Sequence, residues 1–309
     1  MTVHLVGAGP GDVGLLTLRG AELLRRCDVA VHDRLVGPEI LDLAPPWAQR
    51  FDVGKRPGDS PSQIQINDLL VDLGRRFECV VRLKGGDPHV FGRAAEELMA
   101  LRTAGIDAEV VPGVSSVLAA PASVGIPLTT RLASSGFTVI TAHQDPANDR
   151  TLNWDALARL GTTLVILMGA ARAAAFRDRL LAGGMRPDMP VAIITEVSTD
   201  RESERRLVLA ELGVEPVPNP SVIVIGAVAA LDLRSPLPGR AASTATTTST
   251  ATATSTATAT STATATSTAT ATSTATATST ATATSTAASP STPASNAIHS
   301  TATSQEALA

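Results

Sequence analysis

Residues 3–20 read VHLVGAGPGDVGLLTLRG and set the expected fold of the chain. The apolar run at residues 3–6 predicts a strand, the glycines between residues 7 and 11 predict a tight turn, and residues 15–26 predict a helix. A strand, a glycine-rich turn and a helix in this order are typical of dinucleotide-binding sites, where backbone N–H groups at the helix N-terminus hold a pyrophosphate. The stretch therefore predicts an α/β fold with a ligand at the end of the first strand.

Two residues of this turn argue against a phosphate ligand. Pro10 has no backbone N–H to donate, and Asp12 places an anion where a phosphate would rest. Asp33 argues the other way, because it follows a second predicted strand at residues 29–32, close to the position of a ribose-binding acid. A dinucleotide-dependent oxidoreductase that uses residues 7–11 and Asp33 therefore stays an alternative, and so does a turn without a ligand.

Apolar strands and helical segments alternate along the first part of the chain. Further strands are expected at residues 79–83 and 108–111, and residues 66–73 and 94–101 have the apolar spacing of helices. Because these strands are apolar throughout, we expect a mostly parallel sheet that is covered on both faces.

The segment at residues 125–135, rich in Gly, Pro, Thr and Ser, predicts a domain junction. Beyond it, strands with fewer helices between them predict a mixed sheet, at residues 138–141, 163–168, 191–195, 205–209 and 221–227. The expected division is an N-terminal α/β domain at residues 1–130 and a C-terminal α/β domain at residues 131–235.

The remaining residues, 236–309, have a different composition. From residue 241 they are almost purely Ala, Thr and Ser, and the hexamer STATAT repeats without error from residue 249 to 284. Such a segment buries too little apolar surface to offset the entropy of ordering it. We therefore expect a disordered, low-complexity tail.

Composition narrows the class of protein. The formal net charge of -4 argues against nucleic acid as a partner. Cys27 and Cys79 form no metal or redox motif, and small buried thiols are typical of a reducing compartment. The sequence shows no signal core and no apolar run long enough to cross a bilayer, so we expect a cytoplasmic protein without a membrane partner.

Three more loops follow predicted strands. Residues 83–88 read LKGGDP, residues 111–116 read VPGVSS and residues 167–169 read LMG. Adjacent glycines let backbone approach a ligand closely, Asp87 offers a carboxylate, and Ser115 or Ser116 is expected to cap a helix. Ligands of α/β sheets bind outside the carboxyl ends of the strands, where all four loops are expected.

Together these segments resemble the tetrapyrrole methylase family. VGAGPGDxGLLTLRG at the start and VRLKGGDPxVFGR at residues 81–93 are similar to its two signatures, and GIPLTTR at residues 125–131, HDRLV from His32 and VGKR from Val53 fit as well. The resemblance implies two α/β domains with a cleft between them and S-adenosylmethionine as cofactor, without a metal. This cofactor has no phosphate, so Pro10 and Asp12 are no obstacle to its binding.

The resemblance also implies a substrate and a set of cofactor contacts. The substrate would be uroporphyrinogen III, a polycarboxylate tetrapyrrole that gains two methyl groups on carbon to give precorrin-2, for sirohaem or cobalamin, and the enzyme would be a homodimer. Another methylase of the same fold, acting on a later corrin precursor, and a non-catalytic tetrapyrrole-binding relative are alternatives. The implied cofactor contacts are Pro10, Gly85, Gly86, Asp87, Val90, Ser115, Ser116, Met168 and Val197.

For the chemistry, the resemblance implies that Asp33 accepts a proton and Lys55 donates one. The alternative is that Asp33 pairs with Arg34 or a helix terminus and that Lys55 is a surface charge. Arg34 and Arg131 are the expected partners of the substrate carboxylates, and Lys55, Arg56 and Arg93 are further candidates. The chain departs from the family pattern at His32, His89, Ala94, Ala95, Thr130, Leu167 and Val197, which stand where the family has Tyr, Phe, Gly, Gly, His, Tyr and Gly.

Overall fold

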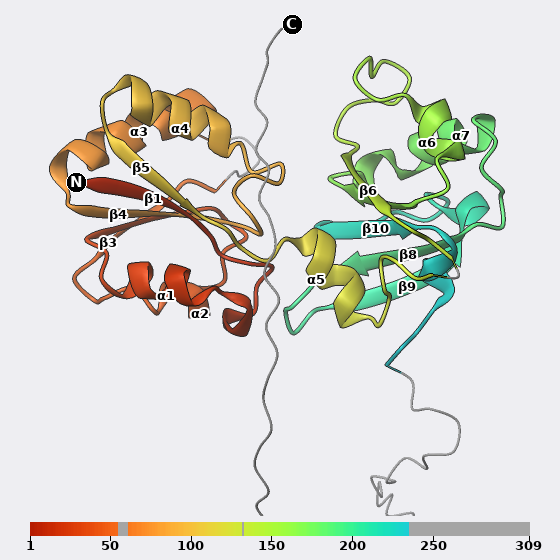
Figure 1. Ribbon diagram of the computed structural model, residues 1–309, viewed down its shortest axis with the longest axis horizontal. Coiled ribbons are helices and arrows are strands. Elements are labelled where there is room, and N and C mark those ends of the chain that lie inside the picture. The colour runs from red at the N-terminus through yellow and green to blue at the C-terminus, as the bar shows by residue number, and fades with distance from the viewer. Residues whose placement is uncertain (55–60, 132, 235–309) are drawn as a thin grey trace, which may run out of the picture. The chain divides into compact units, whose positions relative to one another are not determined.

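Two five-stranded sheets form the core of the described chain (Figure 1). The computed structural model describes residues 1–54, 61–131 and 133–234. The tail expected at residues 236–309 lies outside the described residues, as do Lys55 and Arg56. Among the described residues, no helix is both long and apolar enough to span a membrane.

The first sheet has the strand order β3-β2-β4-β1-β5, and all its strands are parallel. Its strands are β1 (Thr2–Gly7), β2 (Val29–His32), β3 (Gln49–Asp52), β4 (Cys79–Lys84) and β5 (Asp107–Val111). The predicted strand positions are confirmed for four of them, and the parallel sheet with them. The edge strand β3 was not predicted, because three of its four residues are exposed and it has no apolar run.

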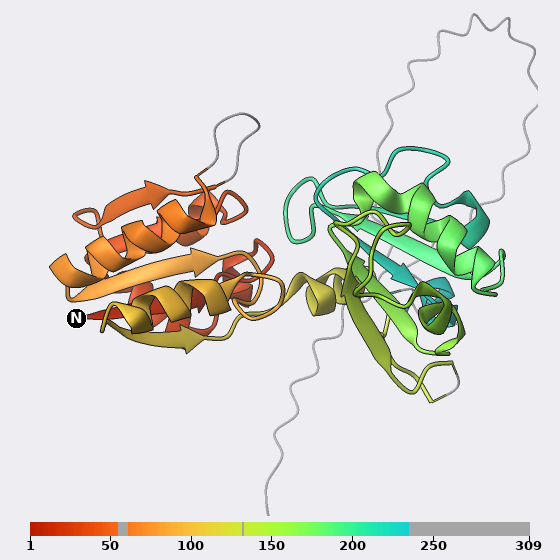
Figure 2. The same ribbon diagram turned by 90° about the horizontal axis from the view of Figure 1, so that it is seen from above.

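Helices cover both faces of the first sheet, as expected. α1 (Leu18–Arg25) and α2 (Pro38–Leu41) lie on one face, and α3 (Gln63–Arg76) and α4 (Ala94–Thr103) lie side by side on the other (Figures 1 and 2). Leu23 and Leu24 of α1 pack with Val6 of β1, whereas Leu5 of β1 packs with the second pair of helices. The alternating strand residues thus fill two separate apolar layers.

The predicted first helix begins later than expected. Residues Val13–Leu15 form a 3-10 turn in which the Asp12 side chain caps the Gly14 N–H. α1 starts only after Thr17, whose side chain accepts a hydrogen bond from Gly20 N. Asp12 therefore has a local structural role in the turn, since its side chain accepts a hydrogen bond from Gly14 N at 2.7 Å.

The second sheet is mixed, as expected, with the order β6-β7-β10-β8-β9. β6 and β7 are parallel, and the other neighbouring strands are antiparallel. Its strands are β6 (Phe137–Thr141), β7 (Thr163–Leu167), β8 (Pro190–Thr195), β9 (Ser203–Val208) and β10 (Ser221–Ile225). α6 (Trp154–Arg159) and α7 (Ala173–Ala182) cover one face, where Trp154 and Phe176 stack with ring centroids 6.0 Å apart.

α5 (Ser116–Ser123) covers the other face of the second sheet. Val117 and Ala120 of α5 pack in one apolar cluster with Val165 of β7 and Val224 of β10. α5 thus packs on the second sheet although it precedes residue 130, and the predicted division at that residue stays a prediction.

Candidate active site

Three glycine loops interlock at the carboxyl end of the first sheet. They follow β1, β4 and β5, the three neighbouring strands at that end. A Cβ on Gly7 would lie 2.5 Å from Gly113 Cα, and a Cβ on Gly113 would lie 2.3 Å from Gly86 O. The loops therefore approach so closely that only glycine fits at Gly7 and Gly113.

Backbone hydrogen bonds join the first two of these loops. Gly9 N donates to Gly86 O at 3.2 Å, and Gly86 N donates to Gly9 O at 2.7 Å. Ala8 N also donates to Lys84 O at 2.8 Å. Gly86 needs its positive φ of 66° for this pairing, which explains a second glycine after Gly85. Among the described residues, a Cβ on Gly85 would meet only Leu35 Cβ, at 3.5 Å.

Asp87 joins the second loop to the third. Its Oδ2 accepts a hydrogen bond from Gly113 N at 3.0 Å, and its Oδ1 accepts one from His89 N at 2.8 Å. Asp87 is thus held by backbone on both oxygens, while the side chain remains half-buried. The carboxylate fixes the loop geometry and places a negative charge beside the glycines.

Ser115 is the helix cap that the sequence predicts. Its hydroxyl accepts a hydrogen bond from Val117 N at 3.3 Å at the start of α5. Ser115 is buried and Ser116 is half-buried, next to the glycine loops: a Cβ on Gly86 would lie 3.7 Å from both Ser115 Cα and Ser116 N. The structure therefore brings the predicted residues of the second and third loops together.

Strained backbone gathers at the same ends of the strands. Among the described residues, five residues other than glycine have a positive φ between 50° and 60°, and all follow β4, β7 or β8: Phe91, Arg93, Met168, Glu196 and Ser198. Each such residue costs of order 1–2 kcal/mol, and strain of this kind clusters at functional sites. The sequence gives no warning of it, because none of these residues favours that conformation.

Met168 and Val197, both predicted to contact the cofactor, differ in their exposure to solvent. Met168 has a φ of 54° directly after β7, and its side chain is 51% exposed, so it is not a core methionine. Val197 is 8% exposed and packs in the apolar cluster beneath α5. Its neighbour Ser198 has a φ of 60°, the conformation that favours glycine. Glu196, the other neighbour, has a φ of 50°, so the backbone places the glycine-like conformation on either side of Val197 and not at Val197 itself.

The loop after β8 reaches the first glycine loop. A Cβ on Gly11 would lie 3.0 Å from Ser198 O and 3.5 Å from Thr199 Cγ2. Glu202 accepts a hydrogen bond from Ser198 N at 2.7 Å, and Arg201 pairs with Glu196, which lowers the Glu196 pKa. A hydrogen bond and an ion pair within residues 196–202 thus fix this loop where it approaches Gly11.

Asp33 pairs with Arg82 and not with Arg34. Asp33 Oδ1 lies 2.6 Å from Arg82 Nη2, and Arg82 and Lys84 also contact Glu97 Oε1, at 3.2 and 2.8 Å. Burial and the nearby Arg82 charge lower the Lys84 pKa. This cluster was not predicted from the sequence. The two cations within an apolar strand were the available signal, since buried cations need carboxylate partners.

The expected substrate cations lie on exposed loops. Arg34 directly follows Asp33. A Cβ added to Gly54, which directly precedes Lys55, would lie 2.7 Å from Arg34 N, so Gly54 lies against Arg34. Arg131 lies in a tight turn closed by Thr130 N and Ser134 O at 2.9 Å. Neither Arg34 nor Arg131 makes an ion pair with a residue that the structure describes. Arg93 does: its Nε lies 2.8 Å from Glu96 Oε1, which lowers the Glu96 pKa.

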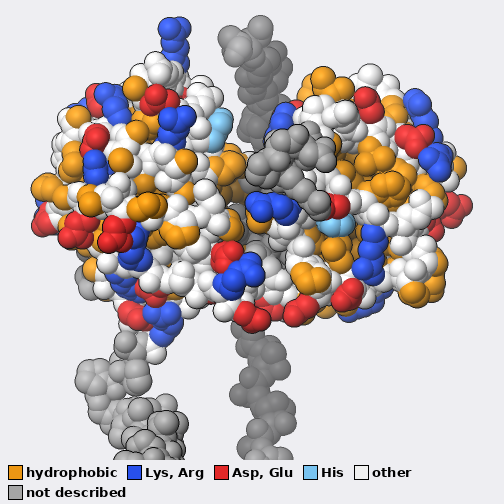
Figure 3. Space-filling model, turned by 180° about the vertical axis from the view of Figure 1, so that it is seen from behind, with side chains coloured by type: hydrophobic (Ala, Val, Ile, Leu, Met, Phe, Trp, Pro, Cys, Tyr) orange, Lys and Arg blue, Asp and Glu red, His pale blue; other side chains and the backbone are white. Residues whose placement is uncertain are grey.

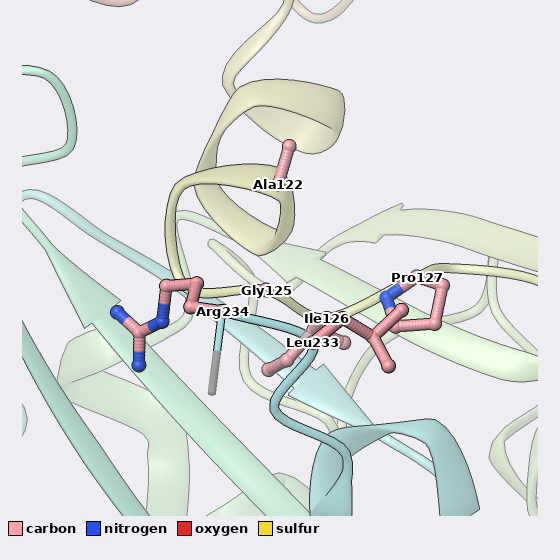
Figure 4. Close-up of a pocket in the computed structure, with 6 residues that line it drawn as sticks. All are labelled: Ala122, Gly125, Ile126, Pro127, Leu233 and Arg234. Carbon is pink, nitrogen blue, oxygen red and sulfur yellow. The ribbon is translucent and has the colours of Figure 1, made fainter. Parts of the chain in front are cut away.

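A separate hollow lies beside the C-terminal end of α5 (Figure 4). Its lining residues are Ala122, Gly125, Ile126, Pro127, Leu233 and Arg234. None of these is a predicted site residue, and Arg234 is paired with Asp232 and Glu204. The glycine loops, not this hollow, carry the expected chemistry.

The comparisons with known proteins agree with the sequence signatures. The family model described as Tetrapyrrole (Corrin/Porphyrin) Methylases matches residues 2–213. A siroheme synthase of Tolumonas auensis is 46% identical over 232 residues, which cover 74% of this chain and 49% of that protein. Siroheme synthase 1 of Yersinia pseudotuberculosis is 47% identical over 229 residues, or 73% of this chain and 48% of that protein. The chain thus spans about half the length of these relatives.

Solved structures resemble the chain over the same region. A crystal structure of uroporphyrin-III C-methyl transferase from Thermus thermophilus, complexed with S-adenyl homocysteine, is 38% identical. It has a TM-score of 0.65 and covers 74% of this chain and 98% of its own. A cobalt precorrin-4 methyltransferase is 23% identical with a TM-score of 0.66, which shows a shared fold.

Proposed function

The chain belongs to the tetrapyrrole methylase family, and we propose that it transfers two methyl groups from S-adenosylmethionine to carbon atoms of uroporphyrinogen III, giving precorrin-2. The family and the fold class predicted from the signatures are confirmed. The similarity to a uroporphyrin-III C-methyl transferase along 98% of that chain supports the choice of substrate. The siroheme synthases are about twice as long as the matched region, so a place in sirohaem synthesis is part of the proposal.

The observation that carries the proposal is the interlocked set of glycine loops. They leave backbone carbonyls and the Asp87 carboxylate at one strand end, without an N–H on Pro10 to hold a phosphate. Oxygen atoms with partial or full negative charge suit a ligand that carries an ammonium and a sulfonium, so the residues present fit S-adenosylmethionine. Bound there, it supplies a methyl group on a sulfonium that is already a good leaving group.

The residues proposed to hold it come from both sheets. Pro10, Gly85, Gly86 and Asp87 belong to the first two loops, and Val90 follows them with 37% of its surface exposed. Ser115, Ser116 and Met168 complete the set. Val197 remains a proposed contact through its backbone only, because its side chain is buried in the core, and the positive φ falls on its neighbours Glu196 and Ser198.

The protein's main task is to position the macrocycle and to take up a proton. A proton must leave the macrocycle after methylation, and we propose Asp33 as its acceptor. One Asp33 oxygen is held by Arg82, and its side chain is 33% exposed, so it is both oriented and reachable. Lys55 is the proposed proton donor, and it lies outside the described residues.

The substrate's carboxylates need cationic partners. Arg34 and Arg131 are both exposed and without an ion pair among the described residues, so their guanidinium groups are available for bidentate contacts. On the face seen in Figure 3, Lys and Arg side chains are interspersed with Asp and Glu. We propose that Arg34 and Arg131 bind the substrate carboxylates through local contacts, although the formal net charge of the chain is -4.

The test is an anaerobic incubation with uroporphyrinogen III and S-adenosylmethionine, followed by mass spectrometry of the tetrapyrrole. A mass gain of two methyl groups supports the proposal. An unmodified tetrapyrrole, from protein that binds S-adenosylhomocysteine in a calorimetric titration, contradicts it and directs the search to a later corrin precursor. Stabilisation by NADP but not by S-adenosylmethionine would favour the oxidoreductase alternative instead.

Two further features belong to the proposal: the homodimer rests on the resemblance, and the cytoplasmic location rests on the sequence. A homodimer is proposed, and light scattering of the full chain tests it. A cytoplasmic location is also proposed, and cell fractionation tests it.

A further inference from the structure

Two cations are buried in the first sheet on the face covered by α3 and α4. Arg82 and Lys84 lie two residues apart in β4, so both share this face with Val80, and each is 2% exposed. Glu97 of α4 supplies their carboxylate partner. Buried ion pairs gain little stability over apolar residues of similar size, so stability alone is a weak reason for this cluster.

The Arg82 guanidinium is fixed from three directions. Its Nε and Nη2 donate to Glu97 Oε1 at 3.3 and 3.2 Å. Its Nη1 donates to the Leu83 carbonyl at 3.0 Å, and Nη2 also donates to Asp33 Oδ1 at 2.6 Å. A planar guanidinium held by Glu97 and the Leu83 carbonyl directs its Nη2 N–H toward Asp33 in one fixed direction, which the rotating ammonium of a lysine does not do.

Glu97 holds both cations through a single oxygen. Its Oε1 also accepts from Lys84 Nζ at 2.8 Å and from Gln63 Nε2 at 3.4 Å, whereas its buried Oε2 has no hydrogen-bond partner among the described residues. The carboxylate is thus turned toward Arg82 and Lys84 at the expense of its second oxygen. Glu97 therefore orients Arg82, while one of its own oxygens forms no hydrogen bond with the described residues.

Asp33 is the one member of the cluster that reaches solvent. Its side chain is 33% exposed, against 0–3% for Arg82, Lys84 and Glu97. Its backbone is fixed too, since Asp33 N donates to Leu83 O at 3.3 Å. Its second oxygen, Oδ2, receives no hydrogen bond from the residues that the structure describes, so it is available to a proton.

We propose that Arg82 is a positioning residue for methyl transfer, whose guanidinium, anchored by Glu97 and the Leu83 carbonyl, holds the Asp33 carboxylate in its proton-accepting orientation. This inference rests on the proposed role of Asp33. In the reaction the macrocycle gains a methyl group and loses a proton, whose bonding electrons return to the ring. The proton joins Asp33 Oδ2, while Oδ1 keeps its hydrogen bond to Arg82.

The test is a double-mutant cycle on Arg82→Lys and Asp33→Asn, read as single-turnover rates of methyl transfer. Arg82→Lys keeps the charge and loses the fixed fork, so we expect its rate to fall about 10- to 100-fold. If Arg82 acts through Asp33, the double variant is as slow as Asp33→Asn alone. Calorimetry should show the same Kd for S-adenosylhomocysteine in all four proteins.

A matched control separates positioning from lost stability. Arg206→Lys likewise replaces a guanidinium that binds backbone carbonyls by an ammonium. Arg206 lies in β9 of the second sheet and donates to the carbonyls of Val124, Ala229 and Leu231. We expect a lower Tm and an unchanged rate. If Arg82→Lys fails to fold, Glu97→Gln replaces it in the cycle; it keeps an acceptor oxygen for Arg82, and its smaller rate loss should also vanish when Asp33 is Asn.

The outcomes distinguish the two proposals. Asp33→Asn at the wild-type rate contradicts Asp33 as proton acceptor and, with it, the role of Arg82. A slow Asp33→Asn together with a normal Arg82→Lys, or with losses that multiply in the double variant, overturns the role of Arg82 alone. A parallel loss of rate in Arg206→Lys also overturns it, because reduced stability then explains the effect.

Discussion

Asp87 Oδ2 accepts the backbone N–H of Gly113 at 3.0 Å, so one carboxylate ties the loop after β4 to the loop after β5. Asp87→Asn keeps the size of the side chain but has one acceptor oxygen in place of two. Its NH2 group must therefore face the N–H of either Gly113 or His89, and two donors cannot form a hydrogen bond with each other. We expect about 1–2 kcal/mol lower stability, and at least tenfold weaker binding of S-adenosylhomocysteine, because the loop and its charge both change. Calorimetry and urea unfolding measure the two effects. Unchanged affinity in this variant would remove Asp87 from the binding site.

The contact between Gly7 and Gly113 makes a second prediction. Gly113→Ala places a Cβ 2.3 Å from Gly86 O, where backbone on both sides prevents relaxation. We expect loss of S-adenosylhomocysteine binding and a destabilisation of about 1–3 kcal/mol. Gly136→Ala is the matched control, since neither Gly113 nor Gly136 has a positive φ, and among the described residues a Cβ on Gly136 would meet only Thr162 Cγ2, at an ordinary contact distance of 3.7 Å. If both variants bind equally well, the close packing of the loops does not shape the site.

Met168 and Val197 should respond in opposite ways. Met168→Ala removes a side chain that is 51% exposed, so we expect weaker cofactor binding with little change in Tm. Val197→Ala leaves a cavity in the core, so we expect a loss of about 1–3 kcal/mol with near-normal affinity. Thermal unfolding and calorimetry on both proteins check this. The reverse pattern would show that the Val197 side chain, not Met168, contacts the cofactor.

Ser198→Gly tests the position of the strained turn. Ser198 has a φ of 60°, and removing its Cβ relieves strain of about 1 kcal/mol, in part offset by the greater freedom of glycine in the unfolded chain. We expect a Tm that is equal or higher. A clear fall in Tm would mean that the Ser198 side chain makes a stabilising contact.

How much of this could be read from sequence differs between fold and site. The strands β2 and β4 were predicted because an apolar run is a local signal, but β3 was not, since its side chains are largely exposed and only pairing with β2 makes it a strand. The glycine loops were predicted as a set from their position at strand ends. Their interlocking was not, because it depends on contacts between residues 7, 86 and 113.

The Asp33–Arg82 pair shows the same limit at the site. Asp33 and Arg82 are 49 residues apart, so spacing gives no reason to pair them, and Arg34 is the nearer cation in sequence. The pair exists because β2 and β4 are neighbours in the sheet. Pairing across neighbouring strands is a property of topology, which one sequence does not display.

Alkaline pH should destabilise the protein through Cys27. Burial, with smaller effects from Cys79 and Asp28, raises the pKa of the Cys27 thiol from 9.0 to about 12, whereas Arg50 acts against them. The folded state keeps the proton to higher pH than the unfolded chain, so this stabilisation is complete below pH 9 and is lost as the pH rises toward 12. We expect the Tm of Cys27→Ala to fall by less than the Tm of the wild type when the pH is raised from about 8 to about 10.5. Equal losses in the two proteins would contradict this assignment.

The most direct measurement follows the transferred methyl groups themselves. The protein is incubated without air with uroporphyrinogen III and S-adenosylmethionine carrying a 13C-labelled methyl group, and the tetrapyrrole is examined by 13C NMR. The proposed function predicts two labelled methyl signals with the shifts of methyl groups on ring carbons. Label found as methyl esters of the substrate carboxylates, or no label in the tetrapyrrole despite cofactor binding, would contradict it.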